Sequence, residues 1–386
     1  MDRIYLDHAA TTPPRAEVAE AMRASLADSN YNPSSLHAEG RRARTLLDNA
    51  RSQIASLLGA ARNEIVFTSG GTESDNLALI GAARAAGRPA RIVATAIEHH
   101  AVLGTLEMLA GDGFETAVLP VDPGGHLDPH TFEAALTTET LLASVGYANN
   151  EIGTVAAIPS LAAAARARGV LFHTDAVQAP RWLPVDVGTL DVDLLSLSAH
   201  KFGGPKGVGV LYVRAGTPLA PIAGGGGQEF GRRSGTPNLS GIVGLARALE
   251  LAVAERDAAA SRIGALRDRL EAGILAAVPD VGVNGREPRL PSMLNVAVAG
   301  VAADELLIAL DLAGVSVSAG SACTSGSPEP SHVLAALVGG RVHAGGGIRI
   351  SLGISTTSAE VDRFLALLPG VVAGLRRSAG ARRGDA

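Results

Sequence analysis

Lysine is rare in this sequence, and its two lysines lie five residues apart. Lys201 and Lys206 stand among 33 lysine and arginine residues, so the chain uses arginine almost wherever it needs a cation. A lysine amine can lose its proton and form a Schiff base with a carbonyl compound, which a guanidinium cannot do. We therefore predict that Lys201 carries out chemistry, against the alternative of an ordinary surface lysine. Lys206 is expected to be structural or to lie near a phosphate.

The chain also has a single cysteine, Cys323. One cysteine excludes an internal disulfide and any zinc site built from several thiolates, so no permanent metal site is expected. A lone cysteine is most often a small buried hydrophobic residue. The surrounding segment, 316–328, is dominated by small, polar and glycine residues, which is typical of an accessible loop. We predict that Cys323 is a reactive thiol.

Two further motifs could bind a group that has an anionic end and a basic ring nitrogen. Residues 69–74 follow a predicted strand and open a predicted helix, where Gly71 and Thr72 offer backbone and hydroxyl donors to a phosphate. Asp175 ends another predicted strand, where a carboxylate can keep a pyridine nitrogen protonated, and Gln178 could reach a ring oxygen. The plainer alternatives are a glycine turn with an N-cap for the first motif and a helix N-cap for Asp175.

Three more polar residues are expected at the same edge of the sheet or close to it. His99 and Asn150 each follow a predicted strand, although a surface histidine and an asparagine turn would explain them equally well. Arg349 lies on a predicted strand between apolar residues, and a buried guanidinium needs an anion. That anion is either the α-carboxylate of an amino acid or the carboxylate of a structural salt bridge.

These residues can meet only if the strands that carry them end at a common edge. Between about residues 60 and 215, short apolar or β-branched runs alternate with alanine-rich helical patterns. This is typical of an α/β protein with βαβ units around a mostly parallel sheet, and ligands bind at the carboxyl ends of its strands. The predicted strands are 64–68, 91–95, 116–121, 141–146, 170–175, 193–197 and 208–213, and the predicted helices are 72–86, 100–110, 129–137 and 159–168.

A second, smaller α+β domain is predicted to follow. Residues 238–278 have helical periodicity and predict one or two connected helices. Strands are then expected at 293–298, 315–319 and 347–352, with helices near 303–313 and 358–374. The arginine-rich end, 376–386, is expected to be frayed and solvated, although a basic tail could contact RNA.

The composition limits the class of function. With 386 residues, of which 47% are hydrophobic and 18% charged, the chain can bury a large core. Its net charge of −5 does not favour nucleic acid as the main ligand. Charged residues or histidine interrupt every apolar stretch before about 20 residues, so no membrane span is expected, and the first residues do not resemble a secretory signal. We therefore expect a cytoplasmic protein.

Taken in sequence order, the motifs resemble those of NifS/IscS-type cysteine desulfurases, which are pyridoxal phosphate (PLP) enzymes of the class V aminotransferase-like group. The matching segments are 6–12, 71–74, 98–99, 149–153, 173–178, 198–201 and 233–236, and they span nearly the whole chain. The resemblance implies the fold type I of PLP-dependent transferases, with a large PLP-binding α/β domain over 15–245 and a smaller α+β domain formed by 1–14 and 246–386. The Ser-Ala-Cys-Thr-Ser sequence around Cys323 is similar to the loop of group I desulfurases, here at about 318–330.

The resemblance also implies which residues hold the cofactor. Lys201 would bind the aldehyde of PLP, and Asp175 would pair with its pyridine nitrogen. The phenolic oxygen would be bonded from the side of Gln178 and Asn150, and His99 would stack on the ring. The phosphate would be held by Gly71, Thr72, Ser198 and His200, and by Thr236 of a second subunit. That last contact predicts a homodimer with its active sites at the interface.

The implied substrate contact is Arg349, which would bind the α-carboxylate of L-cysteine. Two positions depart from the family pattern: His8 replaces a common asparagine, and Gly71 replaces a common alanine. Neither change blocks the implied roles, although His8 could alter substrate contacts.

The implied reaction converts L-cysteine to L-alanine and leaves the sulfur on Cys323 as a persulfide for an acceptor protein. Lys201 would remove the α-proton, the Cys323 thiolate would attack the substrate sulfur, and His99 could assist protonation of the product. Iron–sulfur scaffolds, tRNA-thiolation enzymes, DNA phosphorothioation systems and other sulfur carriers are all compatible acceptors, because no motif indicates the shape of the docking surface. Two alternatives stay open: a selenocysteine lyase or other β-eliminating lyase that needs no cysteine nucleophile, and a catalytically silent partner in sulfur trafficking.

Overall fold

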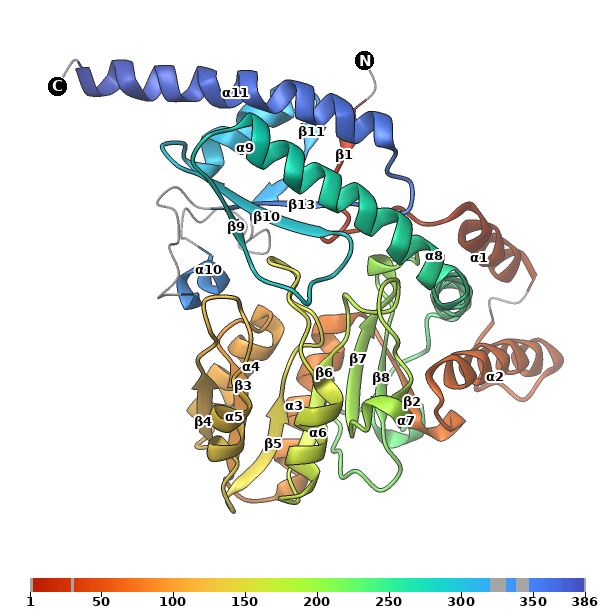
Figure 1. The fold of residues 1–386 in the computed structure, drawn as a ribbon. Helices are drawn as coiled ribbons and strands as arrows, with labels where there is room; N and C mark the ends of the chain where they lie inside the picture. Colours follow the sequence, from red (N-terminus) through yellow and green to blue (C-terminus); the bar gives the residue numbers. More distant parts are fainter. Residues whose placement is uncertain (1–2, 29–30, 320–330, 338–346, 385–386) are drawn as a thin grey trace.

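The computed structural model describes residues 3–28, 31–319, 331–337 and 347–384. Their strands form a seven-stranded sheet, a four-stranded sheet and a two-stranded pair. Figure 1 shows the large sheet in the lower half of the molecule and the smaller sheet in the upper half, where both ends of the chain also lie. We refer to these halves as the large and the small domain.

The large sheet has the strand order β2-β8-β7-β6-β5-β3-β4. Strand β8 runs antiparallel to both of its neighbours and the other pairs in this sheet are parallel, so the predicted, mostly parallel α/β sheet is confirmed. Each predicted strand lies within about two residues of the observed one. The bounds are β2 (Ile65–Thr68), β3 (Arg91–Thr95), β4 (Glu115–Leu119), β5 (Thr140–Ser144), β6 (Leu171–Asp175), β7 (Leu194–Ser198) and β8 (Gly209–Val213).

Helices cover both faces of this sheet, because successive side chains of a strand point to opposite faces. Phe67 of β2 joins one core cluster, which also contains residues of α2 (Ala38–Leu58), α6 (Ile158–Arg166) and α8 (Leu239–Ala277). Its neighbour Val66 joins a second cluster beneath α3 (Gly71–Ala86) and α4 (His100–Gly111). The remaining helices of this domain are α1 (Ala16–Asp28), α5 (Pro129–Ala135) and α7 (Val187–Leu190). The sequence analysis did not predict α1 and α2.

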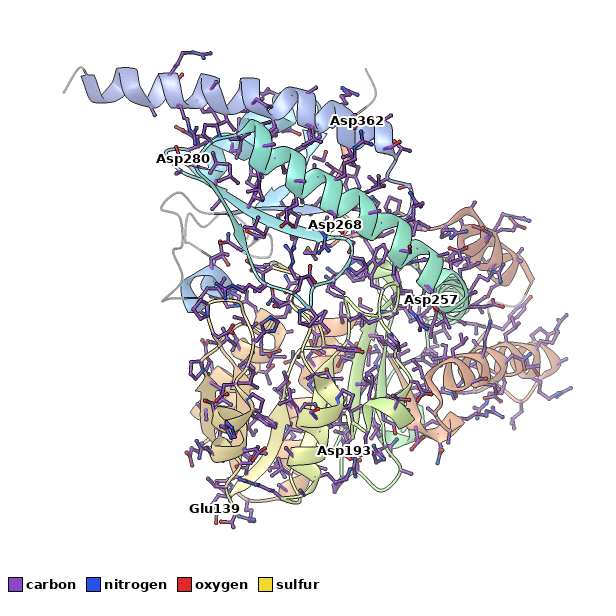
Figure 2. The ribbon with its side chains drawn as sticks, viewed as in Figure 1. Glu139, Asp193, Asp257, Asp268, Asp280 and Asp362 are labelled. Carbon is purple, nitrogen blue, oxygen red and sulfur yellow. The ribbon has the colours of Figure 1, made fainter. Side chains whose placement is uncertain are left out.

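The carboxyl ends of the parallel strands face the small domain. Glu139 and Asp193 directly precede β5 and β7, respectively. Figure 2 shows both residues at the end of the large domain that points away from the small domain, so the strands begin there. A site built on the carboxyl ends therefore lies between the two domains.

The small domain is built on an antiparallel sheet with the order β12-β13-β10-β9. Its strands are β9 (Val281–Asn284), β10 (Met293–Val298), β12 (Ser318–Ala319) and β13 (Gly347–Ser351). The core contains residues of α9 (Ala303–Leu312), α11 (Ser358–Gly384) and the second half of α8. The start of the chain also belongs here, because β1 (Ile4–Tyr5) pairs in parallel with β11 (Val315–Ser316).

A single helix of 39 residues, α8, runs from one domain into the other. Ala252 packs in the core of the large domain, whereas Ile263 packs in the core of the small one. The domain boundary expected between residues 245 and 246 stays a prediction. Helix α8 continues across that position without a break. None of the helices that the structure describes is long and apolar enough to cross a membrane.

Two expectations about the small domain are wrong. The strand expected at 315–319 is divided, because 315–316 pair with β1 whereas 318–319 pair with β13. The end of the chain is not frayed from residue 376, because α11 continues to Gly384. Arg376 donates hydrogen bonds to the carbonyl oxygens of Ala299 and Pro279, at 2.9 and 2.8 Å, and these bonds hold the helix against the domain.

Candidate active site

A cavity of about 500 Å³ lies at the carboxyl ends of the large sheet. Ala9 and Ala10 of the N-terminal segment and Arg349 of β13 complete its wall, so both domains enclose it. The predicted site residues that line it are Gly71, Thr72, His99, Asn150, Asp175, Gln178, Ser198, His200, Lys201 and Arg349. Residues from separate motifs therefore converge on one site.

Lys201 stands at the end of a short 3-10 helix (Ala199–Lys201) that directly follows β7. Its Nζ donates hydrogen bonds to the carbonyl oxygens of Ala9 at 2.7 Å and Ala10 at 3.0 Å. The N-terminal segment thus holds the amine at the cavity wall. Lys206, by contrast, is exposed and does not line this cavity.

Asp175 ends β6 and forms part of an acidic cluster in the cavity wall. Its Oδ1 accepts the backbone N–H of Val177 at 2.9 Å, in a turn rather than at the start of a helix. Burial raises the pKa of Asp175, although the nearby His99 and Lys201 act to lower it. Burial and the nearby Asp175 carboxyl also raise the pKa of Asp75, which comes from α3. A cationic group placed in the cavity would therefore be stabilised by these two carboxyls.

His99 caps the N-terminus of α4. Its Nδ1 accepts the backbone N–H of Ala101 at 3.0 Å, so the ring proton of the neutral histidine resides on Nε2. Burial lowers the pKa of His99, and the nearby Asp175 carboxyl opposes that shift. The ring is thus fixed in one tautomer, with an N–H donor at the other nitrogen.

The residues predicted to form an anion cradle lie together at the start of α3 and the end of β7. Gly71 begins the helix, and a Cβ atom there would lie only 2.7 Å from Cγ2 of Val177. Ser198 and His200 approach the same cavity from the end of β7. Burial lowers the pKa of His200 to about 4, so this ring is neutral at pH 7 and can act as a hydrogen-bonding group without a charge. Backbone N–H groups and hydroxyls at a helix N-terminus suit a phosphate.

The paired asparagines have different roles. Asn149 is structural: its side chain donates to the carbonyl oxygen of Ile97 at 2.8 Å and accepts the N–H of Glu151 at 2.8 Å. Both asparagines line the cavity, as does Gln178, whose Nε2 donates to the carbonyl oxygen of Ala9 at 3.0 Å. The turn interpretation therefore holds for the first asparagine of the pair.

Arg349 is 2% exposed and does have an ion pair within the protein. Its Nη2 lies 2.8 Å from Oδ1 of Asp7, and its Nη1 donates to the carbonyl oxygen of Asn150 at 2.9 Å. Its buried Nε has no hydrogen-bond partner in the described part of the chain. The structural salt bridge is thus present, and donor capacity remains for a ligand.

Two described residues from the sequence analysis, Thr236 and His8, do not line this cavity, and a third residue is not described. Thr236 is exposed in the loop before α8. His8 is buried outside the main cavity, with its ring edge-on to Tyr5 at a centroid distance of 4.9 Å. Cys323, the predicted nucleophile, lies outside the described residues.

The sequence analysis assigned no role to several polar residues of the wall. Glu98 lies beside His99 in the sequence and is buried, and burial raises its pKa to about 7. Four polar atoms of wall residues are buried and lack a hydrogen-bond partner within the described ranges: Asp75 Oδ1, His126 Nε2, Thr154 Oγ1 and Arg349 Nε. Buried polar groups are rarely left unpaired, so this concentration indicates a ligand site. Glu98 directly precedes His99, and Asp75 directly follows the motif 69–74. Their place beside these motifs is the sequence feature that could have indicated a role in the site.

Known proteins similar to this chain match nearly all of it. The family model described as "Aminotransferase class-V" matches residues 4–364. The curated protein "Cysteine desulfurase IscS" of Dictyoglomus turgidum is 47% identical over 375 residues, which cover 97% of this chain and 95% of the relative. The solved structure "NifS-like protein" superposes with a TM-score of 0.91 at 38% identity, over 97% of this chain and 100% of that one. A second, "SspA in complex with cysteine", has a TM-score of 0.81 at 36% identity, over 92% and 100% of the two chains.

Proposed function

The chain belongs to the class V aminotransferase family and is a cysteine desulfurase of the NifS/IscS type. We propose that it acts on L-cysteine, that Lys201 and Asp175 hold PLP, that Arg349 binds the substrate and that Cys323 takes the sulfur. The observation that carries this proposal is the convergence of Lys201, Asp175 and Arg349 on one cavity. These residues supply an amine, an acid and a buried guanidinium.

The cavity residues fit PLP. Asp175 would face the pyridine nitrogen, because a protonated ring nitrogen is the cation that its buried carboxyl requires. The phosphate would be held by Gly71, Thr72, Ser198 and His200, and the ring by His99, Asn150 and Gln178. When bound, PLP supplies an electron sink for the electron pair that remains at the substrate Cα after proton removal.

Lys201 and His99 would move the protons of the reaction. Lys201 would anchor the cofactor through Nζ and take the proton from Cα of the substrate. The carbonyl oxygens of Ala9 and Ala10 support this by holding Nζ at the wall. His99 carries its proton on Nε2 and would deliver it to the product carbon.

Cys323 would take the sulfur. Its thiolate would attack the substrate sulfur, and the bond between that sulfur and Cβ would break with its electron pair on carbon. Protonation of Cβ and return of the proton from Lys201 to Cα would then give L-alanine. The sulfur remains on Cys323 as a persulfide. An acceptor protein of iron–sulfur cluster assembly, thio-cofactor synthesis or tRNA thiolation would then receive it.

The proposal includes a homodimer, in which Thr236 completes the phosphate site of the other subunit. Its support is that Thr236 is exposed and lies away from the cavity of its own chain. The cytoplasmic location stays a prediction.

The test is the formation of L-alanine from L-cysteine by PLP-loaded protein in the presence of a reductant. Wild type should form alanine, whereas Lys201→Ala and Cys323→Ala should lose activity. Lys206→Ala is the matched control and should keep it. Activity that survives in Cys323→Ala would instead support a selenocysteine lyase or other β-eliminating lyase. A wild type without cofactor absorbance would support a silent partner in sulfur trafficking.

A further inference from the structure

The guanidinium of Arg349 is held from two sides before any ligand binds. Its Nη2 contacts Oδ1 of Asp7 at 2.8 Å, and its Nη1 donates to the carbonyl oxygen of Asn150 at 2.9 Å. Asp7 belongs to the same domain as Arg349, whereas Asn150 belongs to the large domain. We propose that Asp7 is a positioning residue, which orients the Arg349 guanidinium toward the carboxylate of the substrate. This proposal rests on the proposed role of Arg349.

The backbone around Asp7 is fixed to the strand that carries Arg349. Asp7 forms a parallel β-bridge with Ser351, which lies two residues after Arg349 on β13. The N–H of Ser351 donates to the carbonyl oxygen of Leu6 at 2.8 Å, and the Oγ of Ser351 accepts the N–H of Ala9 at 2.9 Å. The carboxylate of Asp7 and the guanidinium therefore share one rigid frame.

The hydrogen bonds to the protein leave Arg349 able to bind a carboxylate. A guanidinium has five N–H donors, and a carboxylate needs two of them for a bidentate contact. Asp7 and Asn150 each accept one, so about three remain, including the buried and unpaired Nε–H. Asp7 thus fixes the orientation of the fork without using up its donors.

Within the described ranges, no other carboxylate contacts the Arg349 guanidinium in place of Asp7. Glu151 lies close enough for Arg349 to oppose the rise in its pKa that burial causes. However, the Oε2 of Glu151 accepts the hydroxyl of Ser331 and is hydrogen-bonded there. Loss of the Asp7 carboxylate would therefore leave the carbonyl of Asn150 as the remaining hydrogen-bond acceptor described for this guanidinium.

The same segment also positions the amine end of the site. The carbonyl oxygen of Ala9, two residues after Asp7, accepts hydrogen bonds from Nζ of Lys201 at 2.7 Å and Nε2 of Gln178 at 3.0 Å. One short stretch of backbone, residues 7–10, thus contacts both Arg349, proposed to bind the carboxylate, and Lys201, proposed to move the α-proton. A change at Asp7 should act on carboxylate recognition and leave Lys201 in place.

The test compares two ligands that differ in the carboxylate, L-alanine and L-alaninamide, as competitive inhibitors of L-cysteine turnover by the PLP-loaded enzyme. Wild type should bind L-alanine at least about tenfold more tightly than L-alaninamide, because a charge-assisted contact contributes about that factor. Asp7→Ala should raise the inhibition constant of L-alanine about tenfold and leave that of L-alaninamide unchanged. Asp7→Asn keeps an acceptor oxygen and should stay within about threefold of wild type.

The control is Asp311→Ala, which removes the exposed ion pair of Asp311 with Arg3 in the same domain and should change neither constant. If Asp7→Ala does not fold, Asp7→Ser, whose hydroxyl is too short for the contact, takes its place. Equal effects on both ligands, or no effect on either, would overturn the role of Asp7. A wild type that binds both ligands equally would instead overturn the proposed role of Arg349.

Discussion

Replacing Glu98 by glutamine should change how the stability of the cofactor-free protein depends on pH. Glu98 is 4% exposed and lies in the cavity wall beside His99. Its Oε1 accepts the hydroxyl of Thr95 at 2.6 Å, and its Oε2 accepts the N–H of Gly146 at 2.9 Å. Despite these bonds, burial raises the pKa of this carboxyl from 4.5 to about 7, with a further contribution from Asp175.

The direction of the effect follows from the raised pKa. A carboxyl that binds its proton more tightly in the folded state stabilises the fold below its unfolded pKa, and that contribution is lost as the pH rises through the folded pKa. The window for Glu98 is therefore between pH 4.5 and about 7. At 1.36 kcal/mol for each pKa unit, the loss across this window is about 3 kcal/mol.

The assay is urea unfolding of wild type and Glu98→Gln at a series of pH values from 4.5 to 8. Buried histidines change the stability in the opposite direction, since burial lowers the pKa of His8 to about 4 and that of His173 to about 3. The stability that these histidines contribute is lost as the pH falls. This loss is the same in wild type and Glu98→Gln, so it cancels when their free energies of unfolding are compared at the same pH. The free energy of unfolding of Glu98→Gln should thus gain about 3 kcal/mol on wild type from the lowest to the highest pH. A difference in the free energy of unfolding that stays constant with pH refutes the reasoning.

Three further substitutions probe packing and charge. Gly353→Ala places a Cβ atom 2.3 to 2.5 Å from ring atoms of His8, so urea unfolding should show a loss of about 1–3 kcal/mol that His8→Ala in the same chain largely reverses. Arg51→Met removes the partner of the buried Glu229 and should cost about 3–5 kcal/mol in the same assay, of which Glu229→Gln should recover a part. If it recovers none, the unpaired charge is not the cause. Asp175→Asn should release PLP more readily on dialysis, followed by absorbance, yet leave the cofactor-free protein at least as stable as wild type, because it removes a carboxyl that burial disfavours. Unchanged PLP retention would contradict the role of Asp175.

The sequence predicted the large domain well because its signals are local. Buried parallel strands are short apolar runs, and residues that follow such runs necessarily meet at one edge of the sheet. This explains why the sequence alone places Lys201, Asp175 and His99 at one edge of the sheet, where they line the same cavity. The split of 315–319 between β1 and β13 could not be predicted, because it depends on strands more than 300 residues away in one case and about 30 in the other.

The site was less predictable where identical residue types have different surroundings. Asn149 and Asn150 are adjacent and both line the cavity, yet the side chain of Asn149 also closes a turn through hydrogen bonds to the backbone. Likewise, the sequence left open whether Arg349 meets a substrate or a salt bridge. The structure contains the salt bridge, formed by a residue 342 positions away, and still leaves the Nε unpaired. Contacts of that separation have no local pattern.

The acidic cluster explains why function and stability should respond in opposite directions at Asp175. Burial raises the pKa values of Asp75, Glu98 and Asp175, and the charge of Asp175 adds to the rise at the other two. Such a cluster is unfavourable in the cofactor-free fold, since each ionised carboxyl raises the free energy of the next. A cationic ring nitrogen beside Asp175 would reverse that cost, so the binding free energy of PLP should include the relief of this repulsion. Asp175→Asn removes the repulsion and the partner of the cofactor together, and the gain in stability and the loss of PLP should therefore appear in the same variant.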